Sequence, residues 1–557
     1  MDEGAALHLA STLGIDDITA RVLVGRGIDD AEEARKFLEP KLEQIPDPFT
    51  IPGMDAAVSL IARAIASKKR IGIFGDYDVD GVTASALLAD FLGSLGPTPV
   101  VILPERMERG YGIDAEAVER LVAQGAELII TVDNGIRATA AAERAREIGV
   151  DLVITDHHTP EGELPKADAI VNPKLMDETT SLRDLSGCGV AFMLAMALRK
   201  HLREGGVLPS PEPNLRCLLD VVALGTIADI MPLRGVNRVL TSFGLAEISR
   251  AERLGVRALL DASGAWPSDV TPGTVAFRLA PRINAAGRMG SAMRAFDLLL
   301  TGDEGEAKLM AKALDKANGE RQRLEERVLR EALRAIEGME SPPDGIVVHS
   351  KGWHVGVIGI VAAKLVERYG RPSVVISLDA DPPRGSARCP EGMDLLNALA
   401  PCADRLVQYG GHAQAAGLAL ESGEIDGFVA AFSEACGRLC KGDRSARFKL
   451  DAVVEPHEIT ERLVTELTRC APFGIGNPEP VLALENTSVV DSRVVGNGHL
   501  KLTLASEGKT FEAIGFNMAE GFTGKPKGAH VAFTPQFNTW NGRTTIQLKL
   551  KDIAPIP

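Results

Sequence analysis

Between residues 70 and 155, short runs of apolar residues alternate with segments in which apolar residues recur every three or four positions. The apolar runs cover 70–75, 100–103, 128–132 and 152–155, and the helical spacing covers 82–95, 115–123 and 137–148. Uninterrupted apolar strands that alternate with helices are typical of βαβ units, in which helices cover both faces of a parallel sheet. We therefore expect an α/β domain built on a parallel sheet.

A long helix and a second α/β region follow. Residues 304–337 form the longest helical stretch without proline, with one gap in its apolar stripe at Arg321. Such a helix either connects two domains or packs along its length. Residues 345–349 and 373–377 are predicted strands around a helix at 357–369, with Gly- and Ala-rich loops after them.

The last part of the chain alternates apolar and polar residues with period two. The alternating segments cover 499–504, 510–516, 530–535 and 545–550. Short strands separated by Gly and Asn turns indicate a small barrel of the oligonucleotide-binding (OB) type or a sandwich. We therefore expect five parts: a helical lead-in over 1–50, the parallel-sheet domain over 51–303, a connecting helix over 304–340, a second α/β domain over 341–445 and a barrel over 446–557.

The composition is that of a globular protein with several domains. Its 557 residues are 45% hydrophobic and 25% charged, and 61 basic against 76 acidic residues give a net charge of −15. That balance argues against a wholly basic nucleic-acid-binding surface, but not against a local basic groove. We find neither a run of 18 uncharged apolar residues nor the start of a secretory signal, so we expect a cytoplasmic protein without membrane spans.

The cysteines indicate neither a disulfide framework nor a zinc site. There are seven, an odd number, scattered along the chain, which fits a reducing compartment. Cys436 and Cys440 are one helical turn apart, but no second pair or histidine lies near them in the sequence, so we expect no zinc there.

The strongest local signal is GDYDVDG at 75–81, which places Asp76, Asp78 and Asp80 after the first apolar strand. Three carboxylates so close together repel one another, and a cation or protonation makes them tolerable. A calcium loop would need a bidentate glutamate at its twelfth position, where this chain has Leu87. A solvated acidic turn is the other alternative. The carboxyl end of a strand in an open α/β sheet, however, is a usual ligand position.

Two further strand ends repeat this arrangement. Asp133 follows a strand in TVDNG, and Asp156, His157 and His158 follow the next one in ITDHH. Parallel neighbouring strands would bring these ends to one edge. ALGTIADIMPL places Asp229 in an apolar run, where a buried carboxylate needs a partner. We expect Asp229 to come from a fourth strand at the same edge.

Mixed carboxylate and imidazole ligands are suited to Mn²⁺ or Mg²⁺, whereas structural zinc favours thiolate-rich sites. The carboxylates outnumber what one ion needs, so we expect two divalent metal ions that share a carboxylate. Such a pair activates a water molecule for in-line displacement at phosphorus. The remaining histidine can act as a general acid or stabilise charge.

These motifs resemble those of the DHH phosphoesterase superfamily in order and approximate spacing: D-x-D-x-D-G, V-D-N-G, D-H-H and G-T-I-A-D. GGHAQAAG at 410–417 is similar to the glycine-rich motif of the associated DHHA1 domain. With FRLAPRINAAGRM at 277–289 and APFGIGNPEPV at 471–481, the chain resembles the RecJ-type single-strand-specific 5′→3′ DNA exonucleases over about residues 20–552. The resemblance implies a DHH catalytic domain, a connecting helix, a DHHA1-type domain and an OB-like barrel.

The resemblance also implies roles for individual residues. The implied metal ligands are Asp76, Asp78, Asp80, Asp133, His157 and Asp229. Asp133 would bridge the two ions, and His158 would lie beside the scissile phosphate. We expect Asp156 to orient a histidine rather than bind metal directly.

Nucleic-acid contacts follow from the same resemblance. Arg109, Arg282, Ser386 and Arg388 would form a pocket for the 5′ phosphate, with charge-assisted hydrogen bonds. The further implied contacts are Tyr77, Asn284, Arg288 and His412. Tyr77 would either stack on a base or pack under its loop, and each arginine could instead form a surface ion pair.

We therefore expect a metal-dependent exonuclease that hydrolyses single-stranded DNA 5′→3′ to 5′ mononucleotides, in DNA repair and recombination. Two alternatives stay open: a phosphodiesterase or phosphatase of the superfamily acting on nanoRNA, cyclic dinucleotides or pyrophosphate, and a non-catalytic DNA-binding scaffold. The first group typically lacks the barrel, and the second is expected to have lost metal ligands. The expected partners are single-stranded DNA, a single-strand-binding protein and a RecQ-type helicase, with no membrane, and we expect a monomer.

Overall fold

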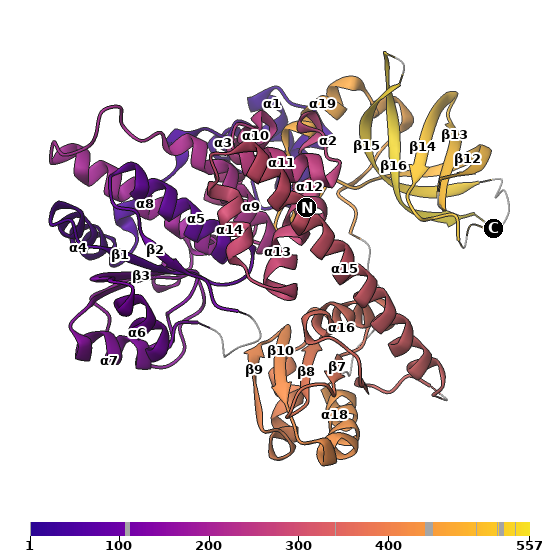
Figure 1. Ribbon diagram of the computed structural model, residues 1–557. Coiled ribbons are helices and arrows are strands. Elements are labelled where there is room, and N and C mark those ends of the chain that lie inside the picture. The colour runs from indigo at the N-terminus through magenta and orange to yellow at the C-terminus, as the bar shows by residue number, and fades with distance from the viewer. Residues whose placement is uncertain are drawn as a thin grey trace.

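The computed structural model describes residues 2–105, 112–339, 341–439, 449–496, 498–520, 522, 528–540 and 542–556. A parallel-sheet domain is joined by the long helix α15 (Glu304–Glu337) to a second α/β domain, and a β-barrel lies beside the N-terminal helices (Figure 1). This arrangement confirms the predicted fold class.

The first sheet contains five parallel strands in the order β2-β1-β3-β4-β5. They are β1 (Ile71–Phe74), β2 (Val100–Ile102), β3 (Leu128–Val132), β4 (Asp151–Thr155) and β5 (Ala169–Val171). The first four correspond to the predicted apolar runs, whereas β5 is only three residues long and was not predicted. Phe74 pairs with Thr131, and Val132 pairs with Thr155, so β1, β3 and β4 end at one edge of the sheet.

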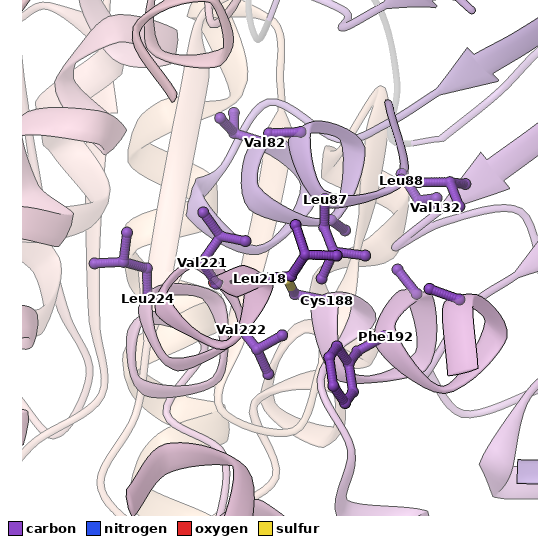
Figure 2. Close-up of a cluster of buried hydrophobic side chains, with 14 of the residues drawn as sticks. Val82, Leu87, Leu88, Val132, Cys188, Phe192, Leu218, Val221, Val222 and Leu224 are labelled. Carbon is purple, nitrogen blue, oxygen red and sulfur yellow. Dashed lines mark hydrogen bonds between the residues drawn. The ribbon is translucent and has the colours of Figure 1, made fainter. Parts of the chain in front are cut away.

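Helices cover both faces of this sheet, as the continuous apolar strands predict. One face carries α4 (Met54–Ala66), α5 (Val79–Ser94) and α8 (Gly187–Glu204), and the other carries α6 (Ala115–Ala123) and α7 (Thr139–Ile148). Figure 2 shows part of the first core, where Leu87 of α5 lies near Cys188 of α8 and Val222 of α9 (Leu219–Ala228). The domain is completed by α10 (Gly235–Arg250), α11 (Leu254–Ser263), α12 (Pro272–Thr274), α13 (Ala280–Met289) and α14 (Met293–Leu300).

The predicted fourth strand before Asp229 is wrong, because residues 219–228 form the helix α9. All residues of α9 from Leu219 to Ile227 are buried, since the helix contacts α5, α8 and α10. A helix that is covered on all sides is apolar all round. Periodicity alone therefore cannot tell such a helix from a buried strand. Asp229 lies at the C-terminal end of this buried helix.

The helix α15 both connects the two domains and packs at each end. Leu314 lies in the core of the first domain, and Val328 and Ile336 lie in that of the second. Between them the apolar stripe is interrupted, and Arg321 lies 3.6 Å from Glu325 of the same helix. Both roles that the sequence left open are therefore present.

The second domain has a five-stranded mixed sheet in the order β6-β7-β8-β10-β9. Its elements are β6 (Ile346–Ser350), α16 (Val355–Tyr369), β7 (Ser373–Ser377), β8 (Arg384–Arg388), α17 (Leu395–Leu399), β9 (Gln408–His412), β10 (Ala415–Ala419) and α18 (Ile425–Leu439). The expectation of loops after β7 is wrong, since RGSAR and most of GGHAQAAG form β8, β9 and β10. Glycine and alanine have low strand propensity, and here antiparallel pairing overrides it.

The C-terminal sheet closes into a barrel rather than a sandwich, because β12 pairs with both β13 and β15. Its strands are β11 (Ala452–Val453), β12 (Leu482–Val495), β13 (His499–Ser506), β14 (Lys509–Gly515), β15 (Ala529–Trp540) and β16 (Arg543–Pro555). The helices α2 (Asp17–Gly25) and α19 (Glu461–Arg469) pack against it, and α1 (Glu3–Leu13) and α3 (Ala31–Leu38) form a separate core with α2. Ile18 and Val22 of α2 enter the barrel core, so the two ends of the chain pack together.

Within the described ranges, no single helix has the length and apolar character needed to cross a membrane. Two segments that meet at 85°, Leu42–Thr50 and Met54–Ala66, would together be long and apolar enough to span a membrane, by length and composition only. Met54, Val58 and Ile61 of this pair are buried in the first core.

Candidate active site

Three carboxylates lie where the chain leaves β1 and enters α5. Asp78 is the N-cap of α5 and accepts a hydrogen bond from the Gly81 N–H at 3.1 Å. Asp76 accepts one from the Tyr77 N–H at 2.8 Å, and Asp80 lies in the first helical turn. Capping bonds and the helix dipole favour carboxylates at this position. GDYDVDG therefore forms a strand-to-helix turn in which Asp76 and Asp80 are buried.

The ends of β3 and β4 bring an aspartate and two histidines to the same place. Asp133 follows β3 with a backbone φ of 63°, a left-handed conformation that aspartate adopts more readily than most residues. Gly187, at the start of α8, lies so close that a Cβ there would be 2.5 Å from the Asp133 Cβ. His157, after β4, is buried, and His158 is half-buried.

The ligand atoms of these side chains form three overlapping sets, and within each set they lie within 4.8 Å of one another. The sets are Asp76–Asp78–Asp133, Asp133–His157–His158 and Asp80–His157–Asp229. His157 Nε2 lies 3.0 Å from Asp133 Oδ1 and 3.6 Å from Asp229 Oδ2. All six expected metal ligands therefore belong to one constellation, joined through Asp133 and His157.

Burial makes this constellation costly without a cation. Burial, followed by repulsion from Asp80 and Asp78, raises the pKa of Asp133 well above its usual value. Burial and the same kind of repulsion raise the pKa of Asp80 to about 7 and that of Asp229 to about 9. A divalent cation would remove this repulsion and favour the ionised carboxylates.

The imidazole of His157 also fits a metal ligand. Burial lowers its pKa to about 3, so the ring is neutral at physiological pH, and neutral imidazole is the form that binds metals. Among the described residues, buried His157 Nε2 forms no hydrogen bond of good geometry, although it lies 3.0 Å from Asp133 Oδ1. Carboxylate oxygens with one imidazole nitrogen are a donor set suited to Mn²⁺ or Mg²⁺.

Asp156 holds His158 instead of joining the three sets. Its Oδ1 lies 2.7 Å from His158 Nδ1 and accepts the N–H groups of His157 and His158, while Oδ2 accepts the Ile136 N–H at 2.9 Å. Burial tends to lower the pKa of His158, but the hydrogen bond and charge of Asp156 outweigh it and raise that pKa. His158, a member of the second set, therefore stays protonated to higher pH than a free histidine.

Three of the expected nucleic-acid contacts meet at the first turns of α16. Arg288, near the end of α13, donates a hydrogen bond to the Gly356 carbonyl oxygen at 3.0 Å. A Cβ on Gly359 would lie 2.9 Å from Ser386 Oγ and 3.2 Å from Arg388 Nη2. Arg388 also donates to Ser386 Oγ at 3.1 Å. Two guanidinium groups and a hydroxyl group therefore gather where α13, α16 and β8 converge. A Cβ on Gly356 would also lie 2.8 Å from the Arg288 carbonyl oxygen, so α13 approaches α16 closely at this glycine.

The other arginines are placed differently. Arg282 forms an ion pair with Asp315 of α15 at 2.8 Å and its side chain is 14% exposed, so it links α13 to the connecting helix. Asn284 is half-buried on α13. Arg109 lies outside the described residues.

Tyr77 and His412 lie on opposite domains. Tyr77 is half-buried against the first core, and a Cβ on Gly287 would be 2.7 Å from its carbonyl oxygen, so the tyrosine packs against α13. His412 lies on β9, and burial, Arg388 and His158 together lower its pKa. Because His158 belongs to the first domain, the charges of the two domains influence each other at His412.

Comparison with known proteins identifies the family. The chain matches the DHH family N-terminal domain over residues 70–226, the DHHA1 domain over 344–438 and the RecJ OB domain over 450–552. It is 38% identical over 560 residues to the single-stranded-DNA-specific exonuclease RecJ of Bacillus subtilis (strain 168), covering 99% of this chain and 70% of that protein. The chain belongs to the RecJ family.

Two further RecJ proteins match nearly all of this chain. The RecJ exonuclease of Dickeya dadantii (strain 3937) is 36% identical over 555 residues, 96% of each chain. The crystal structure of RecJ from Thermus thermophilus in complex with Mn²⁺ matches with a TM-score of 0.85 and 31% identity, covering 100% of this chain and 78% of that one. RecJ membership confirms the resemblance that the motifs indicate, including the DHHA1-type domain and the OB-like barrel.

Sequence reasoning missed the glycines and backbone amides that hold the carboxylates in place in this chain. Asp80 accepts the N–H groups of Gly187 and Cys188 at 2.5 and 3.0 Å, at the N-terminus of α8. A Cβ on Gly225 of α9 would lie 2.5 Å from Asp80 Oδ1. The available signal was weak: a glycine pair that opens an apolar helix in SGCGV, and a lone glycine inside the apolar run of α9.

Proposed function

We propose that this chain is a two-metal-dependent exonuclease that removes 5′ mononucleotides from the 5′ end of single-stranded DNA. The observation that carries the proposal is the convergence of three metal-binding sets, linked by Asp133 and His157, at the strand ends of a RecJ-family fold. So many buried carboxylates oppose folding in the absence of a cation. Their presence together is therefore best explained by metal binding.

The overlapping sets suggest how the ligands divide between two ions. One ion would be held by Asp76, Asp78 and Asp133, and the other by Asp80, His157 and Asp229. Asp133 Oδ1 lies 3.0 Å from His157 Nε2, so Asp133 lies close to the ligands of both ions. Bound divalent metals in such pairs activate a water molecule and stabilise the oxyanions of phosphoryl displacement. Asp80 is fixed for this task by the amides of α8.

His158 supplies a positive charge next to the reacting phosphate. Asp156 fixes the orientation of its ring and raises its pKa. A protonated imidazole in this place can stabilise the charge that develops on a phosphate oxygen or donate a proton to the leaving oxygen. Asp156 thus acts through His158.

The group formed by Arg288, Ser386 and Arg388 is the candidate pocket for the terminal 5′ phosphate. Guanidinium and hydroxyl donors are suited to phosphate oxygens. By resemblance Arg109 and Arg282 would join this pocket, and Asn284, His412 and Tyr77 would contact the strand. A pocket that binds a terminal 5′ phosphate would favour cleavage from the 5′ end.

Digestion of 3′-labelled single strands in Mn²⁺ tests this function and its polarity. We expect strands with a 5′ phosphate to be degraded to mononucleotides, and strands with a blocked 5′ end or a duplex end to be spared. EDTA should abolish the reaction. Equal digestion of 5′-blocked and 3′-blocked strands would contradict the polarity and point to another substrate class of the superfamily.

Family membership also supports a wider cellular role. We propose a cytoplasmic, monomeric enzyme of DNA repair and recombination that works beside a single-strand-binding protein and a RecQ-type helicase. We propose the domain division at residues 51–303, 341–445 and 446–557, with the lead-in over 1–50 and the connecting helix over 304–340. Size-exclusion chromatography with light scattering tests the monomer.

A further inference from the structure

The motif APFGIGNPEPV, which the proposed chemistry does not use, includes a loop that touches the segment after Asp229. We call residues 471–479 the clamp loop; it leads from α19 towards the barrel strand β12. The Leu233 N–H donates a hydrogen bond to the Ile475 carbonyl oxygen at 2.7 Å. The clamp loop is therefore bonded to the chain four residues beyond a proposed metal ligand.

Two glycines let the clamp loop approach this closely. A Cβ on Gly474 would lie 2.8 Å from Leu233 Cδ1, the flexible end of a side chain. A Cβ on Gly476 would lie 2.9 Å from Pro232 Cβ and 3.3 Å from its Cα, in a rigid ring and backbone. Gly476 also has a φ of 73°, a conformation that other residues adopt at a cost. Position 476 is thus the less tolerant of the two.

The segment that the clamp loop contacts is strained. The end of α9 is closed by hydrogen bonds from Ile230 N to Ile227 O and from Met231 N to Thr226 O, both 3.2 Å, around Ile230 at a φ of 58°. This pattern normally has glycine at the left-handed position, and a β-branched residue there persists only where its surroundings hold it. Asn237 of α10 bonds the Pro232 carbonyl oxygen at 3.2 Å. The clamp loop packs against the same residue.

The clamp loop is itself anchored at several points. Asn477 is buried and donates to the Cys470 and Pro472 carbonyl oxygens at 2.9 and 2.8 Å. Arg26, the C-cap residue of α2, donates to both Asn477 Oδ1 and the Pro478 carbonyl oxygen. Glu479 pairs with the barrel residues Lys549 and Lys551 at 3.0 and 2.6 Å. The loop therefore connects the N-terminal helices and the barrel to the Asp229 segment.

We propose that the clamp loop positions the metal ligand Asp229, with Gly476 and the Ile475 carbonyl group as its positioning elements. The loop holds Pro232 and Leu233, and through them it fixes the strained turn at Ile230 that sets the direction of the Asp229 carboxylate. Correct placement of the barrel against the N-terminal helices is then a condition for tight metal binding. This inference rests on the proposed metal site.

The test is Mn²⁺ affinity, measured by isothermal titration calorimetry on the full chain. Gly476→Ala should weaken the affinity of one of the two ions by about tenfold or more, the usual effect of losing an outer support of a ligand. Gly474→Ala should weaken it less. The matched control is Gly508→Ala, since Gly508 has a similar φ of 80° in the β13–β14 turn but nothing within 4 Å of its Cβ. The control should bind Mn²⁺ as the wild type does.

Activity and stability separate positioning from a general loss of structure. Excess Mn²⁺ should restore the rate of Gly476→Ala, because its catalytic groups are intact. The inference would be overturned if Gly476→Ala has the same melting temperature in EDTA as Gly508→Ala and binds Mn²⁺ with wild-type affinity. If Gly476→Ala does not fold, unchanged affinity in Gly474→Ala overturns it instead. A wild type that binds no Mn²⁺, or an Asp229→Asn variant that binds it equally well, would contradict the metal site itself.

Discussion

Replacing Gly187 by alanine should displace the central carboxylate by a predictable amount. The new Cβ would lie 2.5 Å from the Asp133 Cβ and 2.6 Å from its Oδ1, whereas carbon atoms in contact are about 3.5 Å apart. Asp133 or the start of α8 must therefore move by about 1 Å. A misplacement of about 1 Å at a reacting centre costs on the order of a hundredfold in rate, or about 3 kcal/mol of barrier. The methyl group should also cost about 1–3 kcal/mol of stability as overpacking.

Single-turnover hydrolysis of 5′-phosphorylated single-stranded DNA in saturating Mn²⁺ measures this effect without contributions from product release. Gly189→Ala is the matched control, since it lies on the same helix and its nearest contact is the flexible Leu185 Cδ2 at 3.0 Å. We expect the control to keep the wild-type rate. A Gly187→Ala variant that is folded and as fast as the control would refute the argument that Asp133 needs this close approach.

Three further predictions concern the charges of the molecule. In Asp156→Asn the loss of the carboxylate lowers the pKa of His158, so the ring loses its proton at lower pH. The alkaline fall of the pH–rate profile should therefore move to lower pH. An unmoved profile would show that His158 does not act in its protonated form. Arg238→Met removes the donor to four backbone carbonyl groups and should lower the free energy of unfolding in urea by at least about 3 kcal/mol. The control is Arg234→Met, which breaks an exposed ion pair with Asp184 and should lower that free energy by less than about 1 kcal/mol. Arg388→Ala should reduce the preference in kcat/KM for 5′-phosphorylated over 5′-hydroxyl strands by about tenfold, and an unchanged ratio would remove Arg388 from the end pocket.

The first sheet could be predicted because its signals are local. Strands buried on both faces read as continuous apolar runs, and the acidic residues after them stand out against that background. Asp76, Asp133 and His157 lie at the ends of strands whose parallel order makes their side chains meet. Topology and pattern thus suffice for the part of the site that the sheet builds.

The remainder depends on contacts between distant segments. Asp229 was assigned to a strand because a helix surrounded by other helices has no polar face to reveal it. The strands β8, β9 and β10 are stabilised by pairing with one another and not by the propensity of their glycines and alanines. The ion pair of Arg282 with Asp315 joins residues 33 positions apart, which no local pattern records.

The most direct test of the account is the hydrolysis of end-labelled single-stranded DNA in Mn²⁺ by the wild type and by Asp133→Asn. Asp133 links the metal-binding sets, and metal ions supply several kcal/mol of transition-state stabilisation, so the variant should lose at least about a thousandfold in rate. Removing a buried, repelled carboxylate should leave its melting temperature in EDTA unchanged or higher. Undiminished hydrolysis by a folded Asp133→Asn protein would contradict the metal-dependent mechanism at its centre.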